Sequence, residues 1–213
     1  MSYLKHNNCF LDTTVNDVLM SCLAGAIRNY LSKVKSEELV DLPIAMTFNS
    51  RSKSDKLKNV IPLGNNSGGV LFDLPVSVAD PITRLKVTRD KINKLKSLSH
   101  PQIFSAIYSN IIGLLPHMIG RLSTFALKRH VSLIVSNIPG PVETIYLMGY
   151  PVERIVFVPP LVADTGLSVS MLSYNGVLRM TVMSDENIVK NPTALTDSFE
   201  REVQLLGESI LNQ

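Results

Sequence analysis

The sequence has little of what marks several classes of protein. It has no tryptophan and only two cysteines among 213 residues, too few for a disulfide scaffold. The net charge is +3, without a long block of lysine and arginine, so charge gives no support for nucleic-acid binding. No apolar run is long enough to span a bilayer, and the polar N-terminus does not resemble a secretion signal. We therefore expect a protein that is not secreted and does not bind nucleic acid.

Common signatures of catalytic sites are also missing. The sequence contains no Gly-x-Ser-x-Gly elbow, no P-loop and no Gly-x-Gly-x-x-Gly. No two histidines are adjacent, and none is followed four residues later by aspartate; the four are His6, His100, His117 and His130. Histidines and cysteines lack metal-ligand spacing. The residues alone therefore predict no catalytic residue, no metal site and no cofactor.

The composition indicates a folded domain. Hydrophobic residues make up 45% of the chain and charged residues 18%, which is typical of a globular protein. A chain of 213 residues is long enough for one large domain with its own core. Cys22 lies on an apolar helical stripe, which favours a buried, reduced thiol in a cytosolic setting.

Three helices are predicted from periodicity and capping. Residues 15–33 follow a capping box, in which Thr14 caps the helix and Asp17 lies three residues on. Asp80 and Pro81 begin a helix that runs to about residue 98, and a last helix begins at 191–192. One face of the second helix is basic and is interpreted as solvated, with contact to lipid headgroups or an acyl-CoA phosphate as the alternative; its residues are Arg84, Lys86, Arg89, Lys91, Lys94 and Lys96.

Strands are predicted between and after the first two helices. Their residues are 42–49, 70–75, 131–135, 144–148, 152–158, 166–174 and 177–183. Asn175 and Gly176 form a typical two-residue hairpin turn. Because helices interleave with the early strands and the later strands are consecutive, we expect an α/β (α+β) fold in which helices pack on a mixed sheet.

Residues 101–127 form a very apolar segment, interrupted by Gly113 and Pro116. One interpretation is a pair of buried helices with a kink at the proline. The other is a segment that contacts acyl chains or a membrane interface.

Several short segments, taken in order, carry a resemblance to a known family. They are residues 14–31 with TVNDVL at their start, 65–75, 80–85, 136–141 with the sequence SNIPGP, and 166–176. Together they resemble the C-terminal half of the wax ester synthase/diacylglycerol acyltransferase family. The SNIPGP segment is the most specific of them.

The resemblance implies a chloramphenicol-acetyltransferase-like domain over residues 13–213, with residues 1–12 as a lead-in. Members of the family have two domains, and the N-terminal one carries a catalytic His-His-x-x-x-Asp-Gly motif. That histidine takes a proton from a long-chain alcohol or diacylglycerol, whose oxygen attacks the acyl-CoA thioester to give a wax ester or triacylglycerol. This chain lacks the motif. We therefore expect an inactive C-terminal half that needs the N-terminal catalytic domain, in cis or in trans, with acyl-CoA as co-substrate.

The resemblance also assigns candidate site residues, as tunnel or structural motifs rather than catalytic groups. By residue type alone, a rigid turn explains the SNIPGP segment and capping explains the aspartate of the Asn-Asp pair. The candidates are Asn16, Asp17, Ser136, Asn137, Pro139, Gly140 and Pro141.

A second function stays open: a non-catalytic lipid- or acyl-CoA-binding module that contacts a membrane through residues 101–130. The expected location is the cytoplasm or the cytoplasmic side of a membrane, such as the endoplasmic reticulum, the plasma membrane or a lipid droplet.

Overall fold

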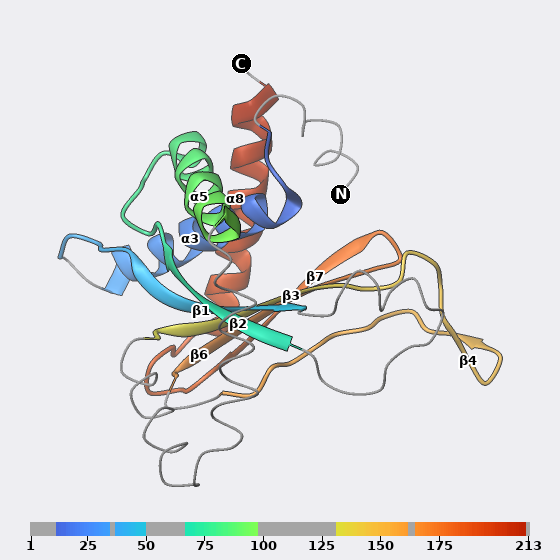
Figure 1. The fold of residues 1–213 in the computed structure, drawn as a ribbon. Coiled ribbons are helices and arrows are strands. Elements are labelled where there is room, and N and C mark those ends of the chain that lie inside the picture. Colours follow the sequence, from blue (N-terminus) through green and yellow to red (C-terminus); the bar gives the residue numbers. More distant parts are fainter. Residues whose placement is uncertain (1–11, 35–36, 50–66, 98–130, 162–164, 212–213) are drawn as a thin grey trace, which may run out of the picture.

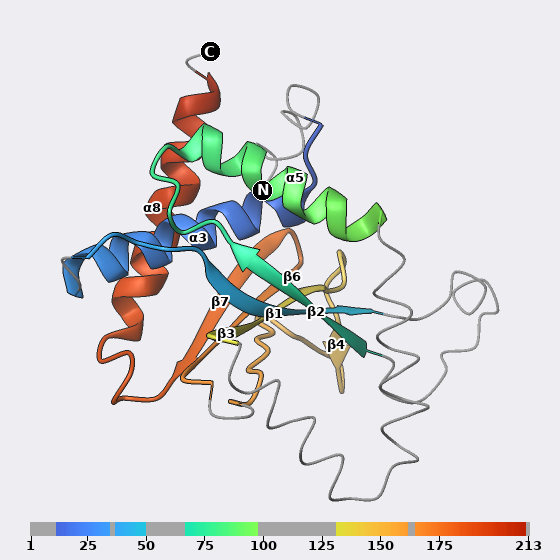
Figure 2. The ribbon, with the colours of Figure 1, turned by 60° about the vertical axis from the view of Figure 1, so that its left-hand side comes forward.

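A computed structural model of the chain describes residues 12–34, 37–49, 67–97, 131–161 and 165–211. Three helices lie on one face of a five-stranded sheet (Figures 1 and 2). The helices are α3 (Val15–Val34), α5 (Pro81–Ser97) and α8 (Pro192–Leu211). In spatial order the strands are β2 (Ser67–Leu74), β1 (Leu42–Asn49), β3 (Leu133–Pro139), β6 (Leu167–Tyr174) and β7 (Val177–Ser184). A separate two-stranded hairpin consists of β4 (Tyr146–Leu147) and β5 (Tyr150–Pro151).

The sheet is mixed. Strand β1 runs antiparallel to β2 and parallel to β3, β3 runs parallel to β6, and β6 runs antiparallel to β7. The Asn175–Gly176 turn joins the last pair with φ of 49° and 74°, as a primed hairpin turn requires. The predicted α/β class, with helices packed on a mixed sheet, is confirmed.

The core lies between the sheet and the helices. Alternate residues of β1, β3 and β6 are buried against the helical layer, because successive side chains of a strand point to opposite faces; they include Ile44, Leu133, Val135, Val169 and Met171. The helices contribute apolar stripes at helical spacing; these include Leu19, Leu23, Leu85, Leu195 and Phe199. Cys22 is buried here, and burial raises the pKa of its thiol to about 12.

Each helix begins with a side-chain cap. In α3, the backbone N–H of Thr14 donates to Asp17 Oδ2 at 2.7 Å and the N–H of Asp17 donates to Thr14 Oγ1 at 3.4 Å, which is the predicted capping box. In α5, Asp80 accepts from the N–H of Thr83 at 2.7 Å. Hydrogen bonds from the side chain and then the backbone of Thr83 hold the pKa of Asp80 below its usual value. Asn191 caps α8.

One part of the basic face of α5 is not solvated, so that prediction is wrong for Arg84. This side chain is 2% exposed and pairs with Glu202 of α8. Its Nε donates to the carbonyl of Ser21 in α3 at 3.1 Å. The pattern of charges along α5 could not reveal this, because the partner lies 118 residues away.

Two predicted strands do not join the sheet. Of residues 144–148, only Tyr146 and Leu147 are in a strand, and residues 152–158 form none. Prolines at positions 151, 159 and 160 remove N–H donors that a central strand needs. The alternating side chains of residues 152–158 belong instead to an extended segment that lies across the sheet.

Several predictions lie outside the described residues. These are the apolar segment 101–127, all four histidines, Cys9 and most of the lead-in. Within the described ranges, no helix is long and apolar enough to cross a membrane, and no cluster of three or more histidine, cysteine or acidic residues could hold a metal ion. The boundaries of the predicted domain stay a prediction.

Candidate functional site

Two of the sequence motifs, the Asn-Asp pair and the SNIPGP segment, meet at one point of the fold. Asn137 Nδ2 on β3 donates a hydrogen bond to Asn16 Oδ1 in the first turn of α3 at 3.1 Å, across 121 residues of sequence. Asn16 Nδ2 contacts Met46 Sδ of β1 at 3.8 Å. The Asn-Asp pair and the SNIPGP segment therefore tie the start of α3 to the centre of the sheet.

Asp17 lies beside this contact and is 1% exposed. One carboxylate oxygen completes the helix cap. The other, Oδ1, is buried and has no hydrogen-bond partner among the described residues. A buried acceptor without a partner is uncommon in folded proteins, which distinguishes Asp17 from an ordinary cap.

Ser136 points the other way. Neighbouring strand residues face opposite sides of a sheet, so Asn137 contacts the helical layer while Ser136 lies on the face away from the helices, called here the open face. There Ser136 Oγ accepts a hydrogen bond from Thr47 Oγ1 of β1 at 2.9 Å. Ser168 and Ser170 of β6 share this face, because they pair with Ile134 and Ser136 in register. Small hydroxyl side chains therefore occupy the middle of the open face.

An extended segment, residues 152–161, crosses the open face and is called here the strap (Figure 1). It is attached by the serine hydroxyls of β6: Ser168 Oγ donates to the carbonyl of Pro159 at 3.1 Å, and Ser170 Oγ donates to the carbonyl of Phe157. Side-chain bonds thus replace the strand ladder that the sequence pattern predicted.

The Pro-Gly-Pro elbow follows directly after β3. Pro139 is the last residue of the strand and pairs with Ser173. A Cβ on Gly140 would lie 2.2 Å from the carbonyl oxygen of Ser173, so only glycine fits. The N–H of Asn175 donates to the carbonyl of Pro141 at 3.0 Å. The elbow is held against the β6–β7 hairpin and presents no reactive group.

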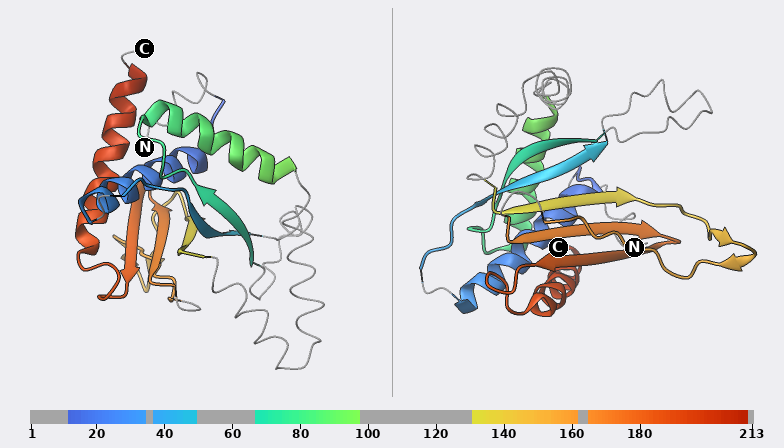
Figure 3. Two further views of the ribbon diagram at one scale, coloured as in Figure 1. Left: turned by 90° about the vertical axis from the view of Figure 1, so that its left-hand side faces the viewer. Right: turned by 90° about the horizontal axis from the view of Figure 1, so that it is seen from below.

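Beyond the elbow the chain forms a projecting hairpin, residues 142–151, called here the arm (Figures 1 and 3). Its base is fixed by Tyr174, whose side chain is completely buried. The tyrosine hydroxyl donates to the carbonyl of Val152 at 2.7 Å and accepts from the N–H of Ile145 at 2.9 Å. The elbow and Tyr174 together set the direction in which the arm leaves the sheet.

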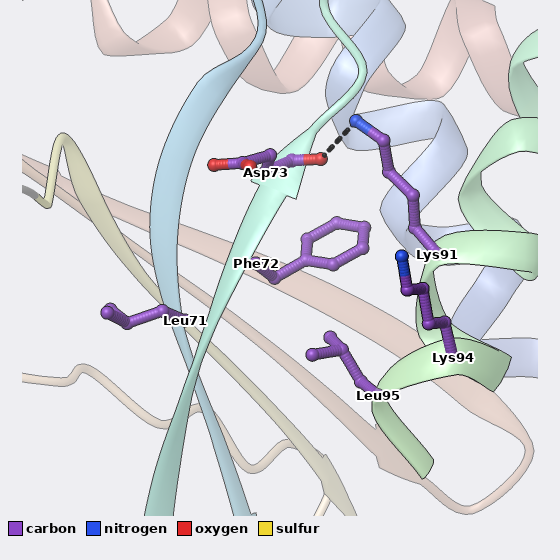
Figure 4. Close-up of a pocket in the computed structure, with 6 residues that line it drawn as sticks. All are labelled: Leu71, Phe72, Asp73, Lys91, Lys94 and Leu95. Atoms are coloured by element: carbon purple, nitrogen blue, oxygen red, sulfur yellow. Dashed lines mark hydrogen bonds between the residues drawn. The ribbon is translucent and has the colours of Figure 1, made fainter. Parts of the chain in front are cut away.

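A pocket of about 300 Å³ lies elsewhere, between β2 and α5 (Figure 4). Its lining residues are Leu71, Phe72, Asp73, Lys91, Lys94 and Leu95. Lys91 Nζ is already engaged, because it donates to Asp41 Oδ2 at 2.6 Å and to the carbonyl of Asp73 at 3.0 Å. None of the candidate site residues lines this pocket.

The contacts bring together some of the predicted site residues and separate others. Asn16, Asp17, Ser136 and Asn137 gather where α3 meets β3, whereas Pro139, Gly140 and Pro141 lie at the end of that strand and serve the base of the arm. The partners of the first group among the described residues are amides, hydroxyls and a thioether. Such groups can orient and support, but they do not form a nucleophile and base pair.

Sequence reasoning missed Thr47 and Tyr174 as supporting residues. Tyr174 is the only aromatic residue of β6 and lies next to the Asn-Gly turn, and this position was the signal available in the sequence. No signal in the sequence pointed to Thr47, because only the parallel pairing of β1 and β3 puts it opposite Ser136.

Known proteins resemble this chain in sequence and in structure. The O-acyltransferase WSD of Acinetobacter baylyi is 26% identical over 210 residues, which cover 95% of this chain and 43% of that protein. The wax ester synthase/diacylglycerol acyltransferase from Marinobacter aquaeolei VT8 matches in structure with a TM-score of 0.69 and 20% identity, over 99% of this chain and 47% of the other. The epimerization domain from the third module of tyrocidine synthetase B shares the fold, with a TM-score of 0.61 and 16% identity.

The chain spans less than half the length of the relatives named above. The family profile of the WS/DGAT C-terminal domain matches residues 63–207, which include β2, the SNIPGP segment, the arm and the β6–β7 hairpin. The chain belongs to the WS/DGAT C-terminal domain family.

Proposed function

We propose that this chain is the C-terminal half of an acyl-CoA-dependent O-acyltransferase that makes wax esters or triacylglycerol from long-chain alcohols or diacylglycerol. The hydrogen bond between Asn16 and Asn137 carries the proposal. It joins two of the motifs through which the sequence resembles the acyltransferases, in a domain that belongs to their family.

The proposed division of labour follows from the side chains. Acyl transfer to a hydroxyl needs a base to accept its proton, and this chain has no His-His-x-x-x-Asp-Gly motif. The base would come from a histidine-bearing N-terminal half, in cis or in trans, and this chain alone would form no ester. Its motif residues would hold α3 against β3, so that the sheet and the strap form one wall of an acyl tunnel.

Acyl-CoA would enter as co-substrate, without a resident cofactor. The proposed location is the cytoplasm or the cytoplasmic side of a membrane, since the acceptors are lipids. Peripheral membrane contact through residues 101–130 is part of the proposal, although that segment lies outside the described residues.

A fusion tests the proposal directly. The N-terminal half of the Acinetobacter baylyi O-acyltransferase WSD would be joined to this chain and assayed with acyl-CoA and either hexadecanol or diacylglycerol. We expect ester formation by the fusion and none by the chain alone. The fusion with alanine in place of its motif histidine is the matched control and should be inactive.

Two results would contradict the proposal. Ester formation by the chain alone would mean that it carries its own base. A fusion that unfolds cooperatively, binds liposomes and forms no ester would favour a non-catalytic lipid-binding module.

A further inference from the structure

The outer edge of β2 carries backbone groups that no neighbouring strand uses in the described part of the chain, because β2 is the first strand of the sheet. The carbonyl of Asp73 points away from β1, since it accepts from Lys91 Nζ of α5 at 3.0 Å. Residues two apart in an antiparallel strand direct their backbone groups to the same side. The N–H and carbonyl of Leu71 therefore also point outward, where they need another partner.

The pocket between β2 and α5, called here the edge pocket, lies beside these groups (Figure 4). Phe72 turns its ring toward α5, and Leu95 extends from α5 toward the ring. The ring belongs to the buried core and Leu95 packs against that core. The edge pocket therefore has an apolar wall that the rest of the fold holds in place.

One positive charge at the edge pocket is not engaged. The ammonium of Lys91 pairs with Asp41 Oδ2 at 2.6 Å, whereas Lys94 is exposed and its ammonium has no partner among the described residues. Lys94 lies on the same side of β2 as the Phe72 ring, and the carboxylate of Asp73 lies on the opposite side (Figure 4), as the alternation of a strand requires. An apolar wall thus adjoins one available cation.

This combination matches an amphiphile with a single negative charge. An acyl chain would bury apolar surface against Phe72 and Leu95, and a carboxylate would accept from Lys94 Nζ and from the N–H of Leu71. A phosphate dianion would bring a second charge without a second unengaged lysine to pair with it. The volume of about 300 Å³ is at the lower limit for small-molecule sites, which favours one chain over a two-chain lipid.

We propose that the edge pocket binds a free fatty acid, with its carboxylate at Lys94 and Leu71 and the adjoining chain against Phe72 and Leu95. The site is separate from the proposed acyl transfer and does not depend on it. None of the candidate site residues lines the edge pocket, and the proposed co-substrate is a thioester, which has no free carboxylate.

The test is a titration of the isotopically labelled chain with decanoate, followed by NMR. We expect saturable shifts of the amides of Leu71, Phe72 and Leu95. Lys94→Gln should weaken binding at least about fivefold, because it removes a charge-assisted hydrogen bond, and Lys94→Arg should restore most of the affinity. Lys96→Gln is the matched control, since it removes the same charge from the same end of α5 at an exposed position outside the pocket, and it should bind within about twofold of the unaltered chain.

Two further ligands separate the contributions of the chain and the carboxylate. Decan-1-ol has the chain without the charge and acetate has the charge without the chain, so each should bind at least about fivefold more weakly than decanoate. Equal thermal midpoints of the unaltered chain and the three variants would show that all are folded.

Several results would overturn the proposal. Equal affinities of Lys94→Gln and the unaltered chain, or of decan-1-ol and decanoate, would remove the carboxylate site. Shifts confined to Thr47 and Ser136 would place the ligand on the open face instead. Binding of decanoyl-CoA without binding of decanoate would assign Lys94 to a CoA phosphate, and flotation with anionic liposomes that requires Lys94, again without decanoate binding, would assign it to lipid headgroups.

The fusion assay keeps the two proposals distinguishable. Decanoate binding at the edge pocket together with an inactive fusion contradicts only the proposed acyltransferase function. An active fusion in a chain that does not bind decanoate contradicts only the fatty-acid site.

Discussion

At Gly140 the space that a side chain would need is occupied by a backbone carbonyl. The glycine lies between two prolines, and its N–H donates to Ser173 Oγ at 3.3 Å. A Cβ there would approach the carbonyl oxygen of Ser173 to 2.2 Å. The glycine is therefore required for close packing, which a rigid Pro-Gly-Pro turn alone would not demand.

Gly140→Ala should lower the free energy of unfolding by about 1–3 kcal/mol, the usual cost of forcing extra atoms into packed structure. Gly207→Ala is the matched control, because a Cβ on that α8 glycine meets nothing within 4 Å. We expect the control to be neutral or more stable by up to about 1 kcal/mol, since alanine is the better helix former. Urea denaturation measures both, and equal midpoints would contradict the close approach.

Between elements, the buried pair of Arg84 and Glu202 joins all three helices. Arg84 also donates to the carbonyls of Ser21, Val78 and Ala79, and Glu202 Oε1 accepts from Asn29 Nδ2 at 2.8 Å. Every side-chain nitrogen of Arg84 and both carboxylate oxygens of Glu202 therefore have a hydrogen-bond partner. Removing one partner would leave the other as an uncompensated buried charge.

Arg84→Met and Glu202→Leu should therefore each destabilise the protein by about 3–5 kcal/mol. The double variant should lose clearly less than the sum, because it leaves no unpaired charge. Lys86→Met, an exposed change on the same helix, should shift stability by less than about 0.5 kcal/mol. A double-mutant cycle by denaturation gives the coupling, and strictly additive losses would contradict a buried pair.

Asp41 links the start of β1 to α5 and to the turn after β2. Burial raises the pKa of its carboxyl, but hydrogen bonds from Lys91 and Ser77 outweigh this and hold the pKa below its usual value. A carboxyl whose pKa is lower in the folded state stabilises the fold above its unfolded pKa. That contribution is lost as the pH falls through the folded pKa.

Between pH 5 and pH 2 the unaltered protein should therefore lose more stability than Asp41→Asn, which cannot titrate. The two should differ most near neutral pH and converge in acid. Thermal unfolding across this pH range measures the difference, with Asp197→Asn on the exposed side of α8 as control. Parallel curves for the unaltered protein and Asp41→Asn would show that the carboxylate makes no net contribution.

At the scale of the molecule, one apolar core among the described residues joins the three helices to the sheet. The arm stands outside that core and projects beyond the end of the strands (Figure 3). A continuous core favours cooperative unfolding of sheet and helices, whereas a segment with few buried contacts opens locally.

Hydrogen exchange should show this contrast. Amides at the arm tip, such as Met148 and Gly149, should exchange through openings of at most a few kcal/mol, while the buried residues of β6 should exchange only by global unfolding at about 5–15 kcal/mol. Protection at the tip equal to that of β6 in the isolated chain would contradict a bare arm.

The sequence by itself determined the features that depend on neighbours in the chain. The caps at Thr14, Asp80 and Asn191 and the turn at Asn175 are all local, because their hydrogen bonds and φ angles involve residues at most three apart. Ordered motifs identified the family for the same reason, since each is a short contiguous signal.

Only the tertiary structure decided which distant groups meet. It buried Arg84 against Glu202, attached the strap by serine hydroxyls instead of a ladder, and joined Asn16 to Asn137. Each result depends on which strands pair and which face the helices cover, and periodicity along the chain does not encode that. A basic side chain or an alternating segment looks the same in sequence whether its partner is water or a group more than a hundred residues away.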